Sequence, residues 1–147
     1  MRLANNIKIN VFVKPEDDEA AVKKHLLNLF PFNLEEEKII LHRSKAKGFN
    51  QREIIVLEVD LVKERHTNSF LDFFKEKLNE QQKQALLSQE NRLDDDCNFF
   101  IRLDKQKLLN NEFWITDSGD CYHIRISVAA FPKKKERARE VVEKIFS

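Results

Sequence analysis

The sequence predicts a single α+β domain over residues 1–147, with one mostly antiparallel sheet and helices packed on one of its faces. Five segments alternate apolar and polar side chains, which is typical of strands. The segments between them repeat apolar residues at helical spacing, so each helix has one apolar stripe. Several strands follow one another as hairpins, which favours antiparallel pairing. Only two glycines and three prolines occur, so we expect no linker and no second domain.

The first predicted strand covers residues 7–13, where isoleucine and valine occupy every second position. Pro15 ends the strand because proline has a fixed φ and no backbone donor. The acidic residues 16–19 suit the positive end of a helix dipole. We therefore expect a helix to begin there and to stop before Pro31.

A hairpin is predicted next, from strands at residues 38–44 and 53–62. Residues 45–52 form its loop, and Gly48 is the expected turn residue.

Two helices should follow the hairpin. The first is capped by Thr67, Asn68 or Ser69, whose side-chain oxygens accept early backbone amides. The second covers roughly residues 80–91, and a third, from about Ala138, closes the chain. The residues that we expect in the core rather than in a site are Phe70, Phe73, Phe74, Val142 and Phe146.

The stretch between these helices holds two further strands, at residues 98–104 and 122–129. A helical turn at 105–110 and a short strand at 112–116 separate them. Successive side chains of a strand point to opposite faces, so each strand has one apolar and one mixed face. The mixed faces carry Phe100, Arg102, His123 and Arg125.

Composition limits the class of protein. Charged residues make up 35% of the chain and the net charge is only +1, so the molecule as a whole is not a polycation. No apolar run approaches the roughly 18 residues of a membrane span. The N-terminus also lacks the apolar stretch of a secretory signal. We therefore expect a cytoplasmic protein with no membrane partner.

Patterns that carry enzyme chemistry are missing from the sequence. The four histidines stand at no metal-ligand spacing, and no GxSxG motif occurs. Two distant glycines cannot form a phosphate-cradling loop. Asp104 beside Lys105 is interpreted as a strand-end ion pair rather than an acid/base pair. The sequence thus predicts no catalytic residue, no metal and no cofactor.

The two cysteines, Cys97 and Cys121, each precede a predicted strand and form no CxxC motif. The first interpretation is a pair of reduced, partly buried thiols. A disulfide is the alternative, which fits mainly a hyperthermophilic source.

Basic residues gather in the predicted hairpin, where residues 43–52 contain four bases and no acid. Such bases neutralise RNA phosphates and release counterions. Phe49 at the tip can stack on an unpaired base. Further bases stand at the end of the strand 98–104. The predicted RNA contacts are Arg43, Lys45, Lys47, Phe49, Arg52, Arg102, Lys105 and Lys107.

A second basic patch follows the last strand and comprises Lys133, Lys134, Lys135, Arg137 and Arg139. The alternative for both patches is a solvated surface without a partner, because charge runs commonly serve only solubility.

The segment FIRLDKQ, followed by a short helix, a short strand and YHIRISV, resembles an archaeal family described as RNA-binding, exosome-associated proteins. The segments KPEDDEAAV, KGFNQREI and NRLDDD match the same pattern in order. The resemblance implies a fold similar to the ribosomal protein that binds 5S RNA, and an RNA-related role without enzymatic activity. The positions carried over are Gly48, Asn50, Arg102, Asp104, Lys105 and Gln106.

The sequence departs from the family pattern in two places. Phe49 and Gln51 stand where the hairpin usually has a second glycine and a proline. Asn111 stands where a glycine usually follows the short helix, and asparagine also adopts positive φ.

Two hypotheses of different class follow. The first is a non-enzymatic RNA-binding protein that meets structured RNA and is linked to RNA processing or the archaeal exosome. The second is a protein-interaction adaptor that docks on an RNA-processing complex without touching RNA. An exposed apolar patch on the sheet or the final helix would favour the adaptor. An enzyme is disfavoured by the missing motifs.

Overall fold

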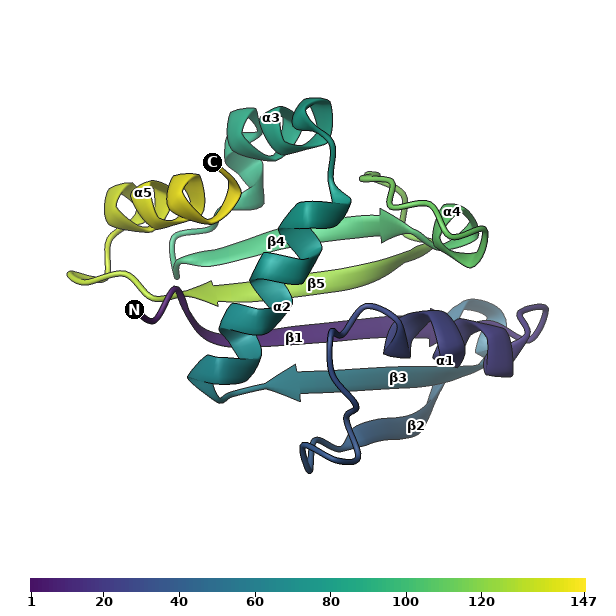
Figure 1. The fold of residues 1–147 in the computed structure, drawn as a ribbon. Coiled ribbons are helices and arrows are strands. Elements are labelled where there is room, and N and C mark those ends of the chain that lie inside the picture. The colour runs from purple at the N-terminus through teal and green to yellow at the C-terminus, as the bar shows by residue number, and fades with distance from the viewer.

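The computed structural model describes residues 1–147 with the exception of the side chain of Phe49. In this described chain one antiparallel sheet has the strand order β2-β3-β1-β5-β4 (Figure 1). Its strands are β1 (Ala4–Val13), β2 (Leu41–Lys47), β3 (Glu53–Leu61), β4 (Asn98–Asp104) and β5 (Cys121–Val128). The predicted α+β class with a single antiparallel sheet is confirmed.

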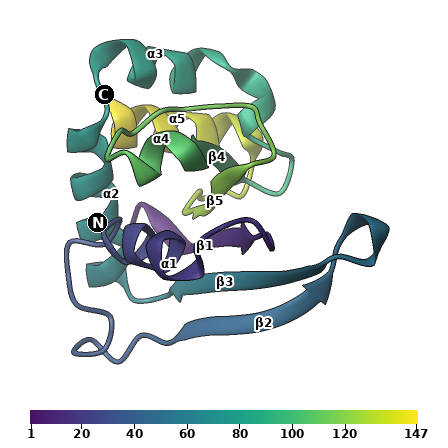
Figure 2. The same cartoon turned by 90° about the vertical axis from the view of Figure 1, so that its right-hand side faces the viewer.

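The helices of the described chain all lie on one face of the sheet, which makes a two-layer structure (Figures 1 and 2). They are α1 (Glu19–Leu27), α2 (Glu64–Lys77), α3 (Glu80–Ser88), α4 (Lys105–Leu109) and α5 (Lys135–Phe146), with short 3₁₀ turns at Phe49–Gln51 and Glu90–Arg92. Among the residues described, no helix has the length and apolar character that a membrane crossing demands.

The core lies between the sheet and the helices. Alternate residues of β1, β4 and β5 are buried, as their apolar periodicity predicts. Of the five residues expected in the core, Phe70, Phe74, Val142 and Phe146 are buried. Phe73 is the exception, because it is only half-buried and its ring lies 5.0 Å from Nζ of Lys77. Its expected place in the core was therefore wrong.

Several predicted boundaries shift in the structure. The strand expected at 38–44 begins at Leu41, because Lys38 adopts a positive φ of 59° within a turn. The helix expected to start near Thr67 already begins at Glu64, and the Thr67 hydroxyl donates to the Glu64 carbonyl. The short strand expected at 112–116 is reduced to one bridge between Leu103 and Ile115.

The backbone φ angles show which residues make the turns of the hairpin and of the segment after α4. Gly48 does not take positive φ in the hairpin turn, whereas Asn50 and Gln51 do, at 61° and 58°. A Cβ on Gly48 would lie 2.1 Å from Cδ1 of Ile54, so the glycine provides room rather than an unusual φ. Asn111 has a φ of 64°, which confirms the expectation that this asparagine can adopt positive φ.

Cys97 and Cys121 are free and buried, which confirms the reduced thiols and excludes the disulfide. Burial raises the pKa of both thiols, so neither is an activated nucleophile.

Candidate nucleic-acid interface

Two of the hairpin bases, Arg43 and Arg52, meet acids from outside the hairpin. Arg43 pairs across the ladder with the buried Leu57, so both side chains point toward α1. Its Nε and Nη2 donate to the Glu19 carboxylate at 2.8 and 3.1 Å. The bond from Arg43 is the main cause that holds the pKa of Glu19 below its usual range.

The other hairpin bases are partly neutralised too. Arg52 forms an ion pair with Glu16, and Nζ of Lys45 lies 3.6 Å from the Glu53 carboxylate. Lys47 is exposed at the end of β2. The premise that this cluster has no acid to neutralise it was therefore wrong, because Glu16 comes from the loop before α1. The Phe49 side chain, predicted to stack on a base, lies outside the described residues.

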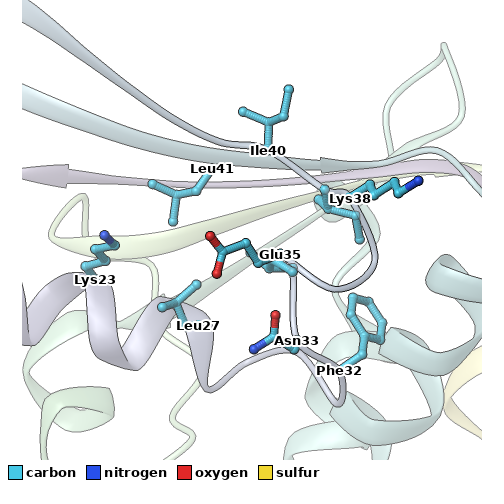
Figure 3. Close-up of a pocket in the computed structure, with 10 residues that line it drawn as sticks. Lys23, Leu27, Phe32, Asn33, Glu35, Lys38, Ile40 and Leu41 are labelled. Carbon is cyan, nitrogen blue, oxygen red and sulfur yellow. The ribbon is translucent and has the colours of Figure 1, made fainter.

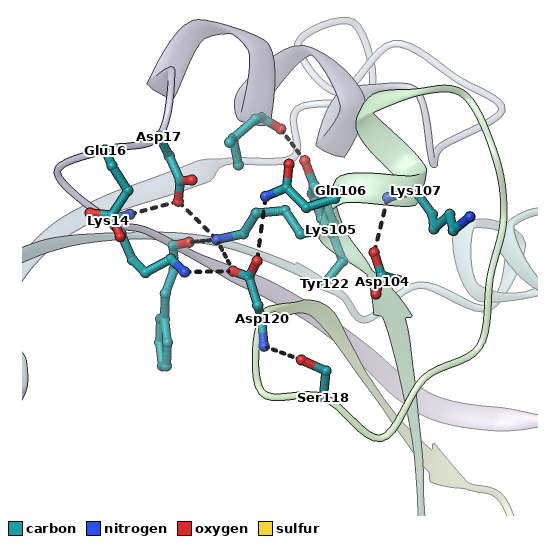
Figure 4. Close-up of polar contacts among 12 residues, drawn as sticks. Lys14, Glu16, Asp17, Asp104, Lys105, Gln106, Lys107, Ser118, Asp120 and Tyr122 are labelled. Atoms are coloured by element: carbon teal, nitrogen blue, oxygen red, sulfur yellow. Dashed lines mark hydrogen bonds and ion pairs between the residues drawn. The ribbon is translucent and has the colours of Figure 1, made fainter.

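Lys105 was predicted to contact RNA, yet its side chain is only 1% exposed. Its Nζ lies 2.7 Å from the Phe12 carbonyl oxygen, 2.9 Å from Asp17 Oδ2 and 2.7 Å from Asp120 Oδ1 (Figure 4). Lys14 also reaches Asp120, at 3.2 Å. This burial argues against the predicted RNA contact of Lys105, because its side chain joins α4 to the segments before α1 and before β5.

The balance of forces on this network favours the charged forms. Burial alone would lower the pKa of Lys105, but its bonds to Asp120 and Asp17 outweigh burial and raise it. Burial likewise opposes ionisation of Asp120, whereas bonds from Lys105 and Lys14 lower its pKa. These buried ion pairs therefore stabilise the contact between α4 and the segments that precede α1 and β5.

Two residues close to Lys105 in the sequence, Asp104 and Lys107, have local contacts. Asp104 does not pair with Lys105 as expected; its carboxylate accepts the backbone N–H of Lys107 at 2.9 Å and caps α4 (Figure 4). Lys107 is exposed, and its Nζ lies 5.5 Å from the centroid of the Trp114 ring.

The face of the sheet opposite the helices is solvated and polar. Strand register places one row of side chains straight across it, comprising His42, Glu58, Asn10, His123 and Arg102. The neighbouring row comprises Asp60, Lys8, Arg125 and Phe100. Acids therefore stand on β3, and bases with an aromatic ring stand on β5 and β4. We call this basic half, formed by Phe100, Arg102, His123 and Arg125, the open face.

A cavity of about 500 Å³ lies at the β4 end of the open face. It is lined by Asn91, Arg92, Phe100, Arg102, Asp117 and His123. The rings of Phe100 and His123 have centroids 5.7 Å apart. We call this cavity the β4 pocket.

Two guanidinium groups converge on one residue in the β4 pocket. Arg102 Nη1 donates to the Asp117 carbonyl at 3.0 Å, and Arg92 Nη2 lies 3.5 Å from the Asp117 carboxylate. Arg92 is only 7% exposed, and its Nη1 donates to the Phe100 carbonyl oxygen at 3.3 Å. The Asp117 side chain is 92% exposed. Asp117 thus meets both arginines, Arg92 through its solvated carboxylate and Arg102 through its backbone carbonyl.

The electrostatic state of the β4 pocket is positive. Burial lowers the pKa of Arg92; Asp117 opposes this shift and Arg102 adds to it. Burial, Arg102 and Arg125 together lower the pKa of His123. Within the described part of the chain, the buried Nε of Arg125 has no hydrogen-bond partner. Positive groups that repel one another in this way favour an anion.

A second cavity, of about 800 Å³, lies between α1, the following loop and β2 (Figure 3). Its apolar lining includes Leu27, Phe32, Ile39 and Leu41, and Lys23, Glu35 and Lys38 stand at its rim. Leu27 and Ile40 are 38% and 66% exposed. We call this cavity the α1–β2 groove.

The basic patch at the start of α5 is also partly paired. Lys135 lies 3.8 Å from Asp95, and Arg139 lies 2.9 Å from Glu90. In the described residues no cluster of three His, Cys, Asp or Glu side chains is placed to hold a metal ion.

The sequence analysis missed Arg92 and Asp117, which line the β4 pocket, and Trp114, which lines a neighbouring cavity with them. Arg92 belongs to the NRLDDD segment and Trp114 is the only tryptophan, so both carried a weak signal. Asp117 carried none, because its position between two arginines depends on how the loop before β5 folds.

The described structure defines an α+β protein with helices on one face of an antiparallel sheet and a basic, aromatic surface on the other. Residues 6–129 match a family model described as RNA binding, and the chain belongs to this family.

Similar proteins are archaeal. The RNA-binding protein PAB1135 of Pyrococcus abyssi is 29% identical over 140 residues, which cover 95% of this chain and 91% of that protein. The solved structure of Mth689, a DUF54 protein from Methanothermobacter thermautotrophicus, has a TM-score of 0.79 at 32% identity and 99% coverage of both chains. Protein AF2318 from Archaeglobus fulgidus has a TM-score of 0.85 at 28% identity, with 97% of this chain and 99% of that one covered.

Proposed function

We propose that this chain is a non-enzymatic, cytoplasmic RNA-binding protein that contacts RNA through the open face. The observation that carries the proposal is the surplus of positive charge around Phe100 and His123 on a sheet face that the described helices leave uncovered. Guanidinium groups bind phosphates, and aromatic rings on a sheet stack with unpaired bases. Family membership and the printed name of the Pyrococcus relative support the same function.

The hairpin and Lys107 form an outer part of the proposed contact surface. Lys47 is exposed, and Lys45 forms only an exposed ion pair with Glu53 at 3.6 Å, so both lysines remain accessible to phosphate. Arg43 and Arg52 would have to exchange Glu19 and Glu16 for phosphate. The hairpin is therefore proposed to add affinity around an RNA that the open face holds. A link to RNA processing or to the archaeal exosome is part of the proposal.

The test removes two charges from the open face and compares the result with removal of two charges elsewhere. RNA binding is measured by fluorescence anisotropy for Arg102→Ser/Arg125→Ser and for the control Lys133→Ser/Lys134→Ser. We expect the open-face variant to bind more weakly and to flatten the slope of log K against log salt by about 1.4 units on single strands, if each arginine meets one phosphate. Equal slopes for parent and open-face variant would exclude this face.

A second candidate, a protein-interaction adaptor, has one observation in its favour. The α1–β2 groove exposes apolar side chains next to β2, which is the outermost strand on that side of the sheet. The apolar stripe of α5, which was to distinguish the hypotheses, is buried. Crosslinking in cells separates the candidates, since an adaptor yields protein partners without enriched RNA.

A further inference from the structure

We propose that the β4 pocket binds one unpaired nucleotide of single-stranded RNA, with its base against Phe100. The phosphate of this nucleotide binds Arg92, where the Asp117 carboxylate now pairs with it, and is reached by Arg102 from the other side. The inference rests on the proposed RNA-binding function. Beyond that function, it specifies the ligand as single-stranded RNA and identifies the Asp117 carboxylate as a group of the protein that competes with the RNA phosphate.

The size and lining of the pocket fit one nucleotide. Its volume of about 500 Å³ lies within the range of small-molecule sites. Phe100 and His123 are half-buried, so their rings have a fixed place and an accessible surface. Bases within a duplex have both faces covered by their neighbours, whereas an unpaired base is free to stack on such rings. The pocket therefore selects single strands.

Asp117 occupies the position that suits a phosphate. Carboxylates and phosphates are the two anionic groups whose oxygens match the planar donor pattern of arginine. Here one carboxylate serves Arg92 at 3.5 Å, while Arg102 receives only the backbone carbonyl of the same residue. The Asp117 side chain is 92% exposed, and ion pairs this exposed contribute little free energy. A phosphodiester of RNA carries the same single negative charge, and it displaces the carboxylate because its nucleotide also stacks on Phe100.

The RNA strand has a place to continue beyond the phosphate. A smaller cavity, of about 250 Å³, shares Arg92 and Asp117 with the β4 pocket and is lined by Trp114. The Trp114 side chain is 54% exposed, and Lys107 lies over its ring. The next nucleotide of the strand therefore meets a second aromatic ring, that of Trp114, and the positive charge of Lys107.

The closing experiment uses Asp117→Asn, which removes the competing charge at a solvated position. The matched control is Asp95→Asn, because Asp95 is 98% exposed, forms an ion pair with Lys135 and belongs to the turn before β4. Binding of a fluorescent single-stranded RNA of mixed sequence and of its duplex is measured by anisotropy. We expect Asp117→Asn to bind the single strand about two- to fivefold more tightly than the parent, and Asp95→Asn to match the parent.

Two further comparisons test the mechanism. The gain from Asp117→Asn should vanish in an Arg92→Gln background, since the Asp117 carboxylate pairs with Arg92. Phe100→Leu keeps an apolar side chain without a ring, and should weaken single-strand binding by about 5- to 150-fold. Phe100→Tyr keeps the aromatic ring and should bind the single strand as the parent does. Melting curves confirm that each variant is folded.

The results separate the two proposals. Equal affinities for Asp117→Asn and Asp95→Asn, or a gain that persists without Arg92, overturn the displacement of Asp117. An equal gain for the duplex overturns the assignment to single strands. Both results leave RNA binding intact. A parent protein that binds neither RNA overturns the function and the pocket together.

Discussion

Two basic regions of this molecule differ in what faces their charges. In the β2–β3 hairpin, Arg43 and Arg52 are paired with acids from the start of α1. On the open face, Arg102 has only a carbonyl oxygen, and Arg125 keeps an unpartnered Nε within the described chain. A cluster of bases is more available to an outside anion where the fold has not already paired its charges.

Lys105 is the extreme case of a base that the fold itself neutralises, and its loss should have the largest effect. Lys105→Met leaves Asp17, which is 8% exposed, without its cation. Breaking a buried ion pair in this way costs about 3–5 kcal/mol, and we expect the lower end because Asp120 keeps Lys14. Chemical denaturation measures the change in the free energy of unfolding.

The same variant has a pH signature. The pKa of Lys105 is raised above its ordinary 10.5, so its contribution to stability is present below pH 10.5 and is lost as pH rises through the higher folded-state pKa. The parent should lose stability in this alkaline range, and Lys105→Met should lack that part of the loss. RNA affinity of the folded variant should equal that of the parent, and a large drop would return Lys105 to the contact surface.

The hairpin offers the second comparison. Lys45→Ser/Lys47→Ser/Arg52→Ser removes three exposed charges and should leave the melting temperature nearly unchanged. If each base met one phosphate, the salt slope would flatten by about two to three units. Arg52 and Lys45 have acids beside them. We therefore expect the change in salt slope, for each charge removed, to be smaller in this variant than in the open-face variant. A larger change for each charge would reverse the ranking of the two regions.

The third experiment removes the acids instead of the bases. Glu16→Gln/Glu19→Gln frees Arg52 and Arg43. We expect RNA binding to strengthen by about two- to fivefold, as the loss of an exposed ion pair predicts. Glu35→Gln/Glu36→Gln, with the same loss of charge in the loop after α1, is the matched control. Equal gains in both variants would mean that only net charge matters.

The smallest expected effect concerns pH and His123. Its folded-state pKa lies below the ordinary 6.5, so the unfolded chain binds this proton more readily and stability should fall as pH drops below about 6.5. RNA affinity should change in the opposite direction, because a bound phosphate favours the charged imidazole. We expect a gain of about two- to threefold, comparable to one exposed ion pair. His123→Gln should abolish both trends, and their persistence would assign them to another histidine.

The sequence by itself determined the elements whose signal is local. Alternation set β1, β3, β4 and β5 because a strand exposes every second side chain, and the stripe of α5 set its buried face. Asn111 was correctly expected at a position that needs positive φ, since asparagine adopts that backbone conformation at low cost. The mixed face of β4 and β5 was also visible as a pattern, before its neighbours were known.

Only the tertiary structure decided which charges are available. Lys105 meets Asp17, 88 residues away, and Arg43 meets Glu19, 24 residues away; neither pairing has a signature in the local sequence. The sequence showed bases near one another along the chain, whereas neutralisation depends on distances through space. The buried position of Lys105 and the place of Asp117 between two arginines come from long-range packing, because Coulomb attraction acts over a few ångströms regardless of the chain that separates the charges.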